Sequence, residues 1–460
     1  MRWLLLFLLL CPSARAAEEL PLGPLGARGK VEAGSAELTL VQLEPDAPAA
    51  RAGLQVADRI VGVGGVTFTP HTADVDDGGR GPQKALGEAL DSHSAHATPE
   101  DRRVRLDVRR GEESLEIDVA LPHRPSVASR EGRDALIQSA RQQLLAAQSE
   151  AGLWDSPVGL SGDRVTTAWA LMALLASSKD EDRDSLDRAA RWLRGPEGKA
   201  WIPDDPLQKG PDNLGNWAIT ATAVALAEHQ LRTGDESNRP VLTRCTQALV
   251  ARMTDDGLFG HDVGAGYTGK GFNVINTLSH LAWAAAADAG VPIEEPAWEK
   301  SLEQIRRSID PNGGVRYWTM EGTGTSDASL RTSSMAIALQ LAGREPELTN
   351  RLCEYLKGHA ARARESHAVG SMGMMLTPAA LWHFDAVAYG RFLEEWRWYL
   401  CLMQEPGGRV SYIGGKGNNG GDSYLGFDDI SCIIALLMLS PPLELLQIHR
   451  RQQITLEPGK

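Results

Sequence analysis

The stretch Thr254-Asp-Asp-Gly-Leu-Phe259 is one copy of a short pattern that recurs along the later part of the chain. The pattern is an acidic or amide residue, then glycine, then an apolar residue. Further copies lie at 149–154, 310–315 and 405–410, with a weaker one at 198–201. The glycine can end a helix in a left-handed turn, and the apolar residue can anchor the loop in a core. Recurrence at roughly 50 residues predicts a repeat architecture.

Two kinds of helix alternate between these turns. The charged, amphipathic kind is predicted at 134–148, 182–194, 240–253, 296–309, 346–362 and 391–404. The alanine-rich kind, apolar on all sides, is predicted at 165–177, 217–229, 272–289, 329–342, 376–388 and 430–439. A helix that is apolar all round must be buried, whereas a striped helix faces water on one side. Residues 132–450 are therefore predicted to form six helical hairpins with the apolar helices inside.

The region 20–122 has a different pattern of short strands and turns. Residues 37–43 alternate apolar and polar side chains, as a half-buried strand does. Residues 83–90 suit a helix, and 104–108 and 115–119 suit a hairpin around Arg110-Gly111. These features predict a small α+β domain at 20–122, a linker at 123–131 and a tail at 451–460 beyond the helical hairpins.

Two runs in this region, Ala47-Pro-Ala-Ala-Arg-Ala-Gly-Leu54 and Asp58-Arg-Ile-Val-Gly-Val-Gly-Gly65, resemble the core signature of bacterial PDZ domains. The resemblance implies an extended peptide partner whose terminal carboxylate is held by backbone N–H groups of a loop. That loop would consist of Leu22, Gly23, Leu25 and Gly26. Pro24 departs from the pattern because it removes one donor. The alternative is a domain that only orients its neighbour.

The paired helices and turns of 134–440 resemble the α/α toroid of protein prenyltransferase β subunits, squalene and hopene cyclases, and thioester domains of complement-like proteins. The combination with a PDZ-like domain resembles a family of uncharacterised exported bacterial proteins. The expected fold is thus multidomain, a PDZ-like domain followed by an all-α (α/α)6 toroid. The motifs Asp-x-Cys, Asp-x-Asp-Asp and Cys-Gly-Glu-Gln are absent from the sequence. Prenyl-transfer, cyclase and thioester chemistry are therefore not expected, and neither a metal site nor a cofactor is predicted.

Residues 1–16 have the features of a signal peptide, with Arg2, an apolar run from Leu4 to Leu10 and a small-x-small site at Ala14-Arg15-Ala16. They predict export to the periplasm or the extracellular space. The apolar run is too short for a stable membrane span. The net charge of −13 argues against a nucleic-acid partner. Cys401 and Cys432 are predicted on neighbouring helices, where they could form a disulfide or remain core thiols.

Because every turn leads into an apolar helix, the starts of these helices are predicted to cluster at one mouth of the ring. Polar residues there are the catalytic candidates: Asp327, Arg331, Asp428 and Asp429, with His280 deeper in. Ordinary helix capping is the alternative role for residues at such positions.

A polar stripe of Asn273, Asn276, Thr277 and His280 lies on one face of an apolar helix. It indicates either a wet cavity, with Asn273 and Asn276 as ligand-binding residues, or an internal network. His280 is accordingly a base or ligand, or a core histidine bonded to Asn276.

The leading functional hypothesis is an exported binding scaffold whose PDZ-like domain and polar mouth hold a peptide or another extracellular ligand. The alternative is a hydrolase or lyase that acts on an extracellular glycan or peptide at the mouth. A structural spacer is the third hypothesis.

Overall fold

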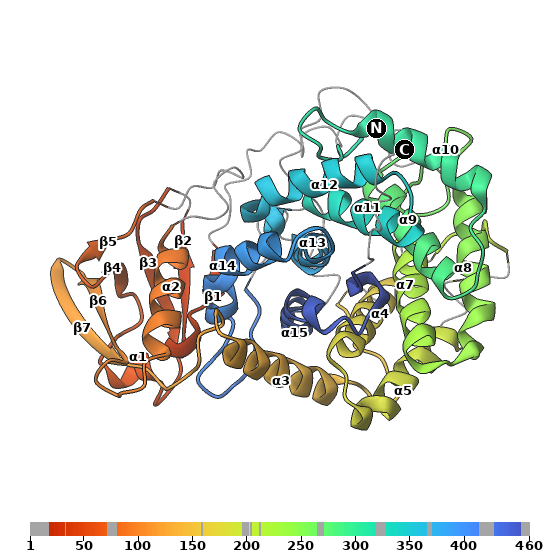
Figure 1. Ribbon diagram of the computed structural model, residues 1–460. Helices are drawn as coiled ribbons and strands as arrows, with labels where there is room; N and C mark the ends of the chain where they lie inside the picture. The colour runs from red at the N-terminus through yellow and green to blue at the C-terminus, as the bar shows by residue number, and fades with distance from the viewer. Residues whose placement is uncertain are drawn as a thin grey trace, which may run out of the picture.

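The computed structural model describes residues 18–32, 34–70, 81–157, 160–195, 202, 205–210, 213–264, 271–318, 328–365, 370–413 and 427–451. The protein is mostly helical, with an antiparallel sheet at its N-terminal side (Figure 1). The predicted signal peptide and nearly all of the predicted tail lie outside these ranges.

The apolar helices form a closed inner ring. They are α4 (Leu160–Ser177), α7 (Gly215–Thr233), α9 (Asn273–Asp288), α11 (Ser329–Ala342), α13 (Gly370–Phe384) and α15 (Phe427–Leu439). Each packs on the next in chain order, and α15 packs back on α4 (Figure 1). Side chains around the whole circumference of α9 and α11 are buried, as their composition predicts.

The charged helices surround this ring. They are α3 (Arg130–Ala147), α5 (Arg183–Arg194), α8 (Arg239–Arg252), α10 (Glu295–Ser308), α12 (Pro346–Gly358) and α14 (Ala386–Leu402). The predicted alternation is confirmed, but the boundaries near α13 and α14 are not. Asp385 accepts a hydrogen bond from Val387 N at 2.8 Å and so caps α14 several residues before the predicted start.

The recurrent glycines adopt the left-handed backbone conformation that the turn pattern predicts. Gly257 and Gly313 have φ of +82° and +99°. A Cβ at these positions would lie 2.6 Å from Lys300 O and 2.7 Å from Arg351 O, respectively. Glycine therefore provides the left-handed turn and also lets the turn approach the backbone of the next outer helix.

The N-terminal sheet has the strand order β1-β2-β3-β4-β6-β7, with β5 paired to β4 and every pair antiparallel. Its strands are β1 (Glu18–Pro21), β2 (Ala27–Val31), β3 (Leu38–Leu43), β4 (Arg59–Val63), β5 (Val66–Thr67), β6 (Arg103–Arg110) and β7 (Glu113–Ala120). The helices α1 (Pro48–Arg51) and α2 (Pro82–Ser94) complete this sheet unit. The predicted hairpin is confirmed, since Arg110 pairs with Glu113 across Gly111.

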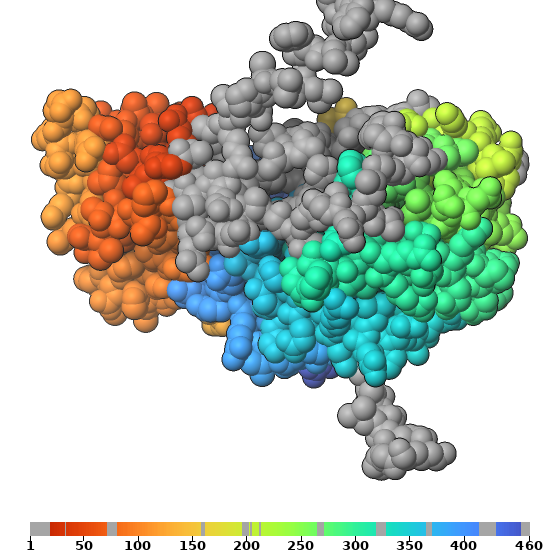
Figure 2. All heavy atoms as spheres, turned by 90° about the horizontal axis from the view of Figure 1, so that it is seen from above, coloured from red at the N-terminus to blue at the C-terminus, as the bar shows by residue number. Residues whose placement is uncertain are grey.

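The sheet unit lies against one side of the ring, next to α14 (Figures 1 and 2). Gly87 of α2 is so close to α14 that a Cβ would lie 2.8 Å from Trp398 O. Lys84 forms a 2.6 Å ion pair with Glu395. Arg124, in the predicted linker, donates hydrogen bonds to Gln404 O at 2.7 Å and Glu405 O at 2.9 Å. The segment 123–131 is therefore part of the interface between the sheet unit and the ring, which we call the joint.

The predicted carboxylate-binding loop faces this joint. A Cβ on Gly23 would lie 2.5 Å from Cys401 O, and Leu22 and Leu25 are fully buried. The N–H groups of Leu22, Leu25 and Gly26 bond to carbonyl oxygens within the loop and its flanking strands. The expectation of an open carboxylate site is corrected here, because α14 covers the loop and the N–H groups of Leu22, Leu25 and Gly26 already donate to the protein itself.

Two further observations concern the described residues. None of their helices combines the length and apolar character needed to cross a membrane. The Cys401 thiol is free and buried, so the predicted option of a disulfide with Cys432 is not realised.

We expect Gly87→Ala to loosen the joint, because its methyl group would collide with the backbone of α14. The cost is about 1–3 kcal/mol of overpacking. Hydrogen exchange along α14 and the melting temperature would report it. Gly390→Ala is the matched control, since Gly390 lies exposed on α14 and an added methyl group would meet nothing within 4 Å; it should be neutral or gain up to about 1 kcal/mol. Equal behaviour of the two variants would contradict the close packing.

Candidate functional site

The starts of neighbouring inner helices are tied together at one end of the ring. Asn216 N, in the first turn of α7, donates to His261 O at 3.0 Å, in the connection that leads to α9. Asn273 N, at the start of α9, donates to Tyr317 O at 3.0 Å, in the connection that leads to α11. The predicted clustering of helix starts therefore holds for α7, α9 and α11. We call this the entry end of the ring.

Buried polar side chains of the inner helices hold the anchor residue that ends each turn. Trp154 N donates to Thr167 Oγ1 at 3.1 Å, Phe259 N to Asn276 Oδ1 at 3.0 Å, and Val315 N to Thr332 Oγ1 at 3.1 Å. Thr167, Asn276 and Thr332 are fully buried. A buried N–H without an acceptor would be costly, so these side chains have a structural role in three repeats.

The predicted polar stripe of α9 belongs to the same system. Asn276 Nδ2 donates to Asn273 Oδ1 at 3.3 Å, and Asn273 Nδ2 donates to Arg316 O at 2.9 Å. Thr277 Oγ1 donates to Val274 O within the helix at 3.2 Å. Of the two alternatives, the structure contains the internal network. Asn273 and Asn276 are occupied by the protein itself and are not placed to bind a ligand.

His280 lies away from the entry end. It is fully buried, with ring centroids 4.3 Å from Trp298 and 5.4 Å from Trp283, both edge-to-face. Trp298 belongs to the outer helix α10, so His280 faces the wall between the two rings. Neither ring nitrogen has a hydrogen-bond partner among the described residues. Burial lowers the pKa of His280 to about 3, so it is neutral. His280 is therefore not placed to act as the predicted base, and the predicted hydrogen bond between His280 and Asn276 is not formed.

Of the other catalytic candidates, the structure describes the side chains of Arg331 and Asp429. Arg331 is buried, donates from Nε to Val315 O at 2.9 Å and has its guanidinium carbon 5.4 Å from the Tyr317 ring centre. It therefore supports the turn before α11. Asp429 is partly buried in the first turn of α15 and makes polar contacts. Asp327 and the Asp428 side chain lie outside what the structure describes.

The entry end carries a row of aromatic rings that we call the aromatic arc: Trp217, His261, Phe272, Tyr317 and Trp318. The ring centroids are 4.4 Å apart for His261 and Phe272, 5.5 Å for Phe272 and Tyr317, and 5.4 Å for Tyr317 and Trp318. His261, Tyr317 and Trp318 are partly exposed. The arc therefore combines stacked apolar faces with accessible edges, which suits ligands that have flat apolar surfaces.

His261 has a defined tautomer when neutral. Trp217 Nε1 can only donate, and it lies 2.8 Å from His261 Nδ1. Nδ1 is therefore the acceptor, and the ring proton lies on Nε2. In this state Nε2 of His261 has the character of a hydrogen-bond donor.

A buried ion pair fixes the residue next to His261. Arg252 Nη1 lies 2.8 Å from Asp262 Oδ1, and both side chains are 1% exposed. Arg252 also donates to Asn216 Oδ1 at 3.2 Å, to Pro206 O and to Gln208 O. The Arg252 and Asp262 charges would be costly to bury alone, but here they pair with each other, and Arg252 also bonds to nearby oxygen atoms. This network holds the connection that contains His261 rigid.

The sequence analysis did not select the aromatic arc, although the turn pattern contains a signal for it. His261 and Tyr317 each lie two residues after an anchor residue, Phe259 and Val315. Tyr412 has the same relation to the anchor Val410. An aromatic residue at this repeated offset could have marked the entry end without the structure.

The opposite end of the ring is covered by the C-terminal segment, which includes η7 (Pro441–Leu443) and η8 (Gln447–His449). Glu228 on α7 accepts hydrogen bonds from Gln447 N at 2.7 Å and Ile448 N at 2.9 Å. Burial raises the pKa of Glu228 to about 7. The described residues contain no group of three or more His, Cys, Asp or Glu side chains that could hold a metal at either end.

Comparison with known proteins identifies a family. The family described as "Domain of unknown function (DUF6288)" matches residues 134–449, which is most of the ring. No curated protein matches the chain.

Several solved structures with α/α toroid folds are similar at low identity. A possible member of the GH105 family from Klebsiella pneumoniae subsp. pneumoniae MGH 78578 is 16% identical, covering 70% of this chain and 96% of its own, with a TM-score of 0.46. The type II terpene cyclase MstE from Scytonema is 15% identical, covering 67% and 98%, with a TM-score of 0.43. An inactive variant of an α-1,6-mannanase, GH76A, of Salegentibacter sp. HEL1_6 is 10% identical, covering 68% and 99%, with a TM-score of 0.48.

These comparisons contradict the leading hypothesis of a binding scaffold. The similar structures named by activity are enzymes, which agrees with the enzyme alternative. At these identities and TM-scores, the likeness gives this chain neither a reaction nor a substrate.

We expect Thr332→Val to destabilise the ring, because it removes the acceptor for Val315 N and leaves that N–H buried. The expected loss is about 1–3 kcal/mol, measured from the denaturant midpoint. Thr277→Val is the matched control, since Thr277 is equally buried but donates to a carbonyl within its own helix; it should cost less. Equal losses of stability in the two variants would contradict a larger contribution from the hydrogen bond to the anchor residue.

We expect Glu228 to make the protein less stable as pH rises. Its pKa is about 7 in the folded chain, against an ordinary value of 4.5. The folded state therefore keeps the proton longer, and stability falls between these two pH values, by at most about 1.4 kcal/mol per pH unit. Glu228→Gln should remove this component from the pH profile of stability.

Glu150→Gln, at an exposed turn position, is the control and should leave the shape of the pH profile unchanged. Parallel profiles for the wild type and Glu228→Gln would contradict a raised pKa at Glu228.

Proposed function

Since the chain belongs to the family described as a domain of unknown function (DUF6288), whose description assigns no activity, we propose a function from the site itself. The protein is an enzyme, a hydrolase or lyase, that acts on a glycan at the entry end of its ring. The observation that carries this proposal is the aromatic arc with His261 fixed inside it.

The glycan is favoured over the peptide by the surface that the arc offers. Sugar rings have flat apolar faces that pack on aromatic side chains, with hydroxyl groups around the edge that need polar partners. Tyr317 and Trp318 supply partly exposed rings, and His261 supplies an N–H donor beside them. A peptide strand would instead need a line of unpaired backbone groups.

The proposed role of His261 is to polarise a substrate oxygen. Its Nε2–H is a donor held by the bond from Trp217 to Nδ1. A neutral imidazole in this state is suited to stabilising negative charge that develops on oxygen, and not to removing a proton. Proton transfer in glycan cleavage ordinarily uses carboxylic acids. We assign it to the carboxylates predicted at the same end, Asp327, Asp428 and Asp429.

We also propose that the chain is exported and that the sheet unit is a PDZ-like domain that orients the ring. The signal-like residues 1–16 support export. The packing of the sheet unit on α14 supports the orienting role. Export is tested by N-terminal sequencing of protein recovered from the periplasm or medium, which should begin after residue 16.

The proposed activity is tested by incubating the full-length protein with a panel of oligosaccharides and measuring reducing ends and unsaturated products. For a substrate that is cleaved, His261→Ala should lower kcat by about 10²–10³-fold, as loss of one oxyanion donor does. Trp217→Phe keeps an aromatic ring but removes the N–H, so it should lower kcat less and leave KM nearly unchanged.

His96→Gln, at an exposed histidine of the sheet unit, is the matched control and should keep full activity. Melting temperatures of all variants separate lost catalysis from lost folding. Absence of cleavage across the panel, or an unchanged rate in a folded His261→Ala protein, would refute the proposal.

A further inference from the structure

A short segment after α15 covers the far end of the ring, opposite the entry end. We call residues 440–451 the C-terminal strap. Its η7 packs on α4, α13 and α15, and its η8 packs on α11 and α13. Glu228 of α7 accepts hydrogen bonds from Gln447 N and Ile448 N, and the Gln447 side chain bonds to Asp288 at the end of α9. The strap therefore contacts all six inner helices.

The middle of the strap is buried as a core segment is. Leu446, Ile448 and His449 are at most 1% exposed. Beyond them, Arg451 Nε donates to Trp382 O at 3.0 Å, and its guanidinium carbon lies 4.5 Å from the Trp382 ring centre. Apolar burial and these contacts hold the strap against the ring.

His449 is the buried titratable group of the strap itself. Neither of its ring nitrogens has a hydrogen-bond partner among the described residues. Burial, and then a charge on His383, lowers the pKa of His449 to about 3. A proton on this imidazole would be a buried charge without a counter-ion, which is costly. The closed strap therefore requires a neutral His449.

His383 of α13 is a second imidazole beneath the strap. Its Nε2 donates a hydrogen bond to Ile448 O. Burial lowers the pKa of His383, although the bond to Ile448 O and the charge of Glu444 act in the opposite direction; Arg451 adds to the lowering. Protonation of both imidazoles would place two like charges under one segment.

Two carboxyl groups on the inner helices act in the opposite sense. Burial raises the pKa of Glu228 to about 7, against the effects of its two backbone hydrogen bonds and of Arg450. Burial also raises the pKa of Asp288, against its bond to Gln447. These groups take up protons more readily when the strap is closed, so their protonation in acid favours the closed strap.

We propose that the C-terminal strap is an acid-sensitive closure, which protonation of His383 and His449 releases from the far end of the ring. In the released strap both imidazoles reach water, where a proton is well solvated. The strap lies opposite the aromatic arc, so this inference does not depend on the proposed enzyme activity.

The pH range follows from the groups that change their pKa. His449 has an ordinary value of 6.5 and about 3 under the closed strap, so each pH unit lost between them favours release by up to about tenfold. Glu228, with 4.5 ordinarily and about 7 when closed, opposes release by the same factor per unit down to pH 4.5. Asp288 opposes it down to its ordinary value of 3.8, and His383 favours it. Release should therefore be steepest at about pH 3–4.5.

The proposal is tested on the full-length protein by hydrogen exchange between pH 3 and pH 7, corrected for the intrinsic exchange rate. Amides of residues 446–451 should lose protection by up to about tenfold per pH unit below pH 4.5. Amides of α9, in the inner ring, should stay protected over the same range. Loss of protection only together with α9 would mean global unfolding and would overturn the proposal.

Variants separate the opposing groups. Glu228→Gln removes the main opposing titration, so the onset of release should move toward pH 6.5. His449→Phe keeps a buried ring that takes no proton, and His383→Gln keeps a donor for Ile448 O; each should reduce the loss of protection in acid.

His96→Gln, at an exposed histidine of the sheet unit, is the control and should exchange as the wild type does. Strap protection that does not change with pH in the wild type and in Glu228→Gln would overturn the proposal. An unchanged pH profile in folded His449→Phe and His383→Gln proteins would do the same.

Discussion

In four of the connections that the structure describes, the anchor residue has a buried backbone N–H, and the surrounding helices must accept it. Thr167, Asn276 and Thr332 do so in three repeats, and in the last turn Gln143 of α3 accepts from Val410 N at 2.8 Å. This requirement explains why helices that are otherwise apolar carry polar residues near their starts. It also fixes where each connection leaves the core, and therefore the geometry of the entry end.

The candidate site follows from that geometry. Two residues after the anchors Phe259 and Val315, the chain places His261 and Tyr317 at the entry end. Hydrogen bonds from Asn216 N and Asn273 N then tie these connections to the neighbouring helix starts. The repeat thus brings aromatic rings from separate hairpins into one row. The buried Arg252–Asp262 pair keeps the His261 connection rigid, as a site that must hold a donor in a fixed position requires.

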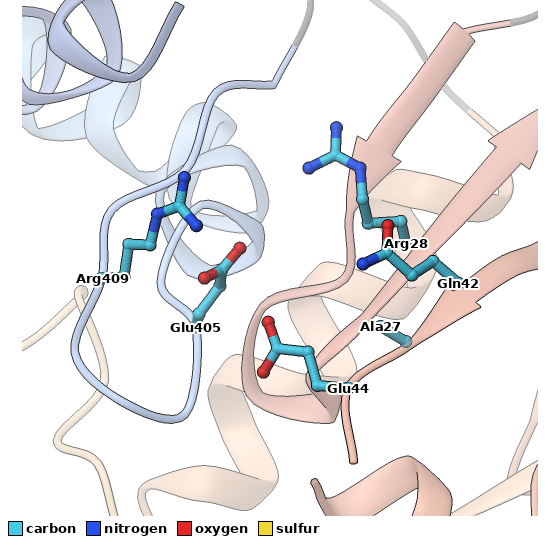
Figure 3. Close-up of a pocket in the computed structure, with 6 residues that line it drawn as sticks. All are labelled: Ala27, Arg28, Gln42, Glu44, Glu405 and Arg409. Carbon is cyan, nitrogen blue, oxygen red and sulfur yellow. The ribbon is translucent and has the colours of Figure 1, made fainter.

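The joint with the sheet unit has two consequences that come from the same close packing. At Gly23 and Gly87 the backbone of the sheet unit lies close to the backbone of α14. This packing covers the loop that resembled a carboxylate-binding site. The turn at 405–409 then meets the start of β2 and the end of β3, which creates a charged cavity that neither part has alone (Figure 3). Packing of the two parts therefore covers one predicted binding surface.

The sequence by itself determined the alternation of buried and striped helices, the glycine turns and the sheet hairpin, because these depend on periodicity and local backbone preference. Tertiary structure alone decided the roles of the polar residues. His280 faces Trp298, Arg331 supports the turn at Val315, and Leu22 to Gly26 pack on α14, because each depends on residues distant in sequence. A pattern along one helix states which side chains share a face. It does not state which neighbour that face meets, and that contact decides whether a polar group is structural or functional.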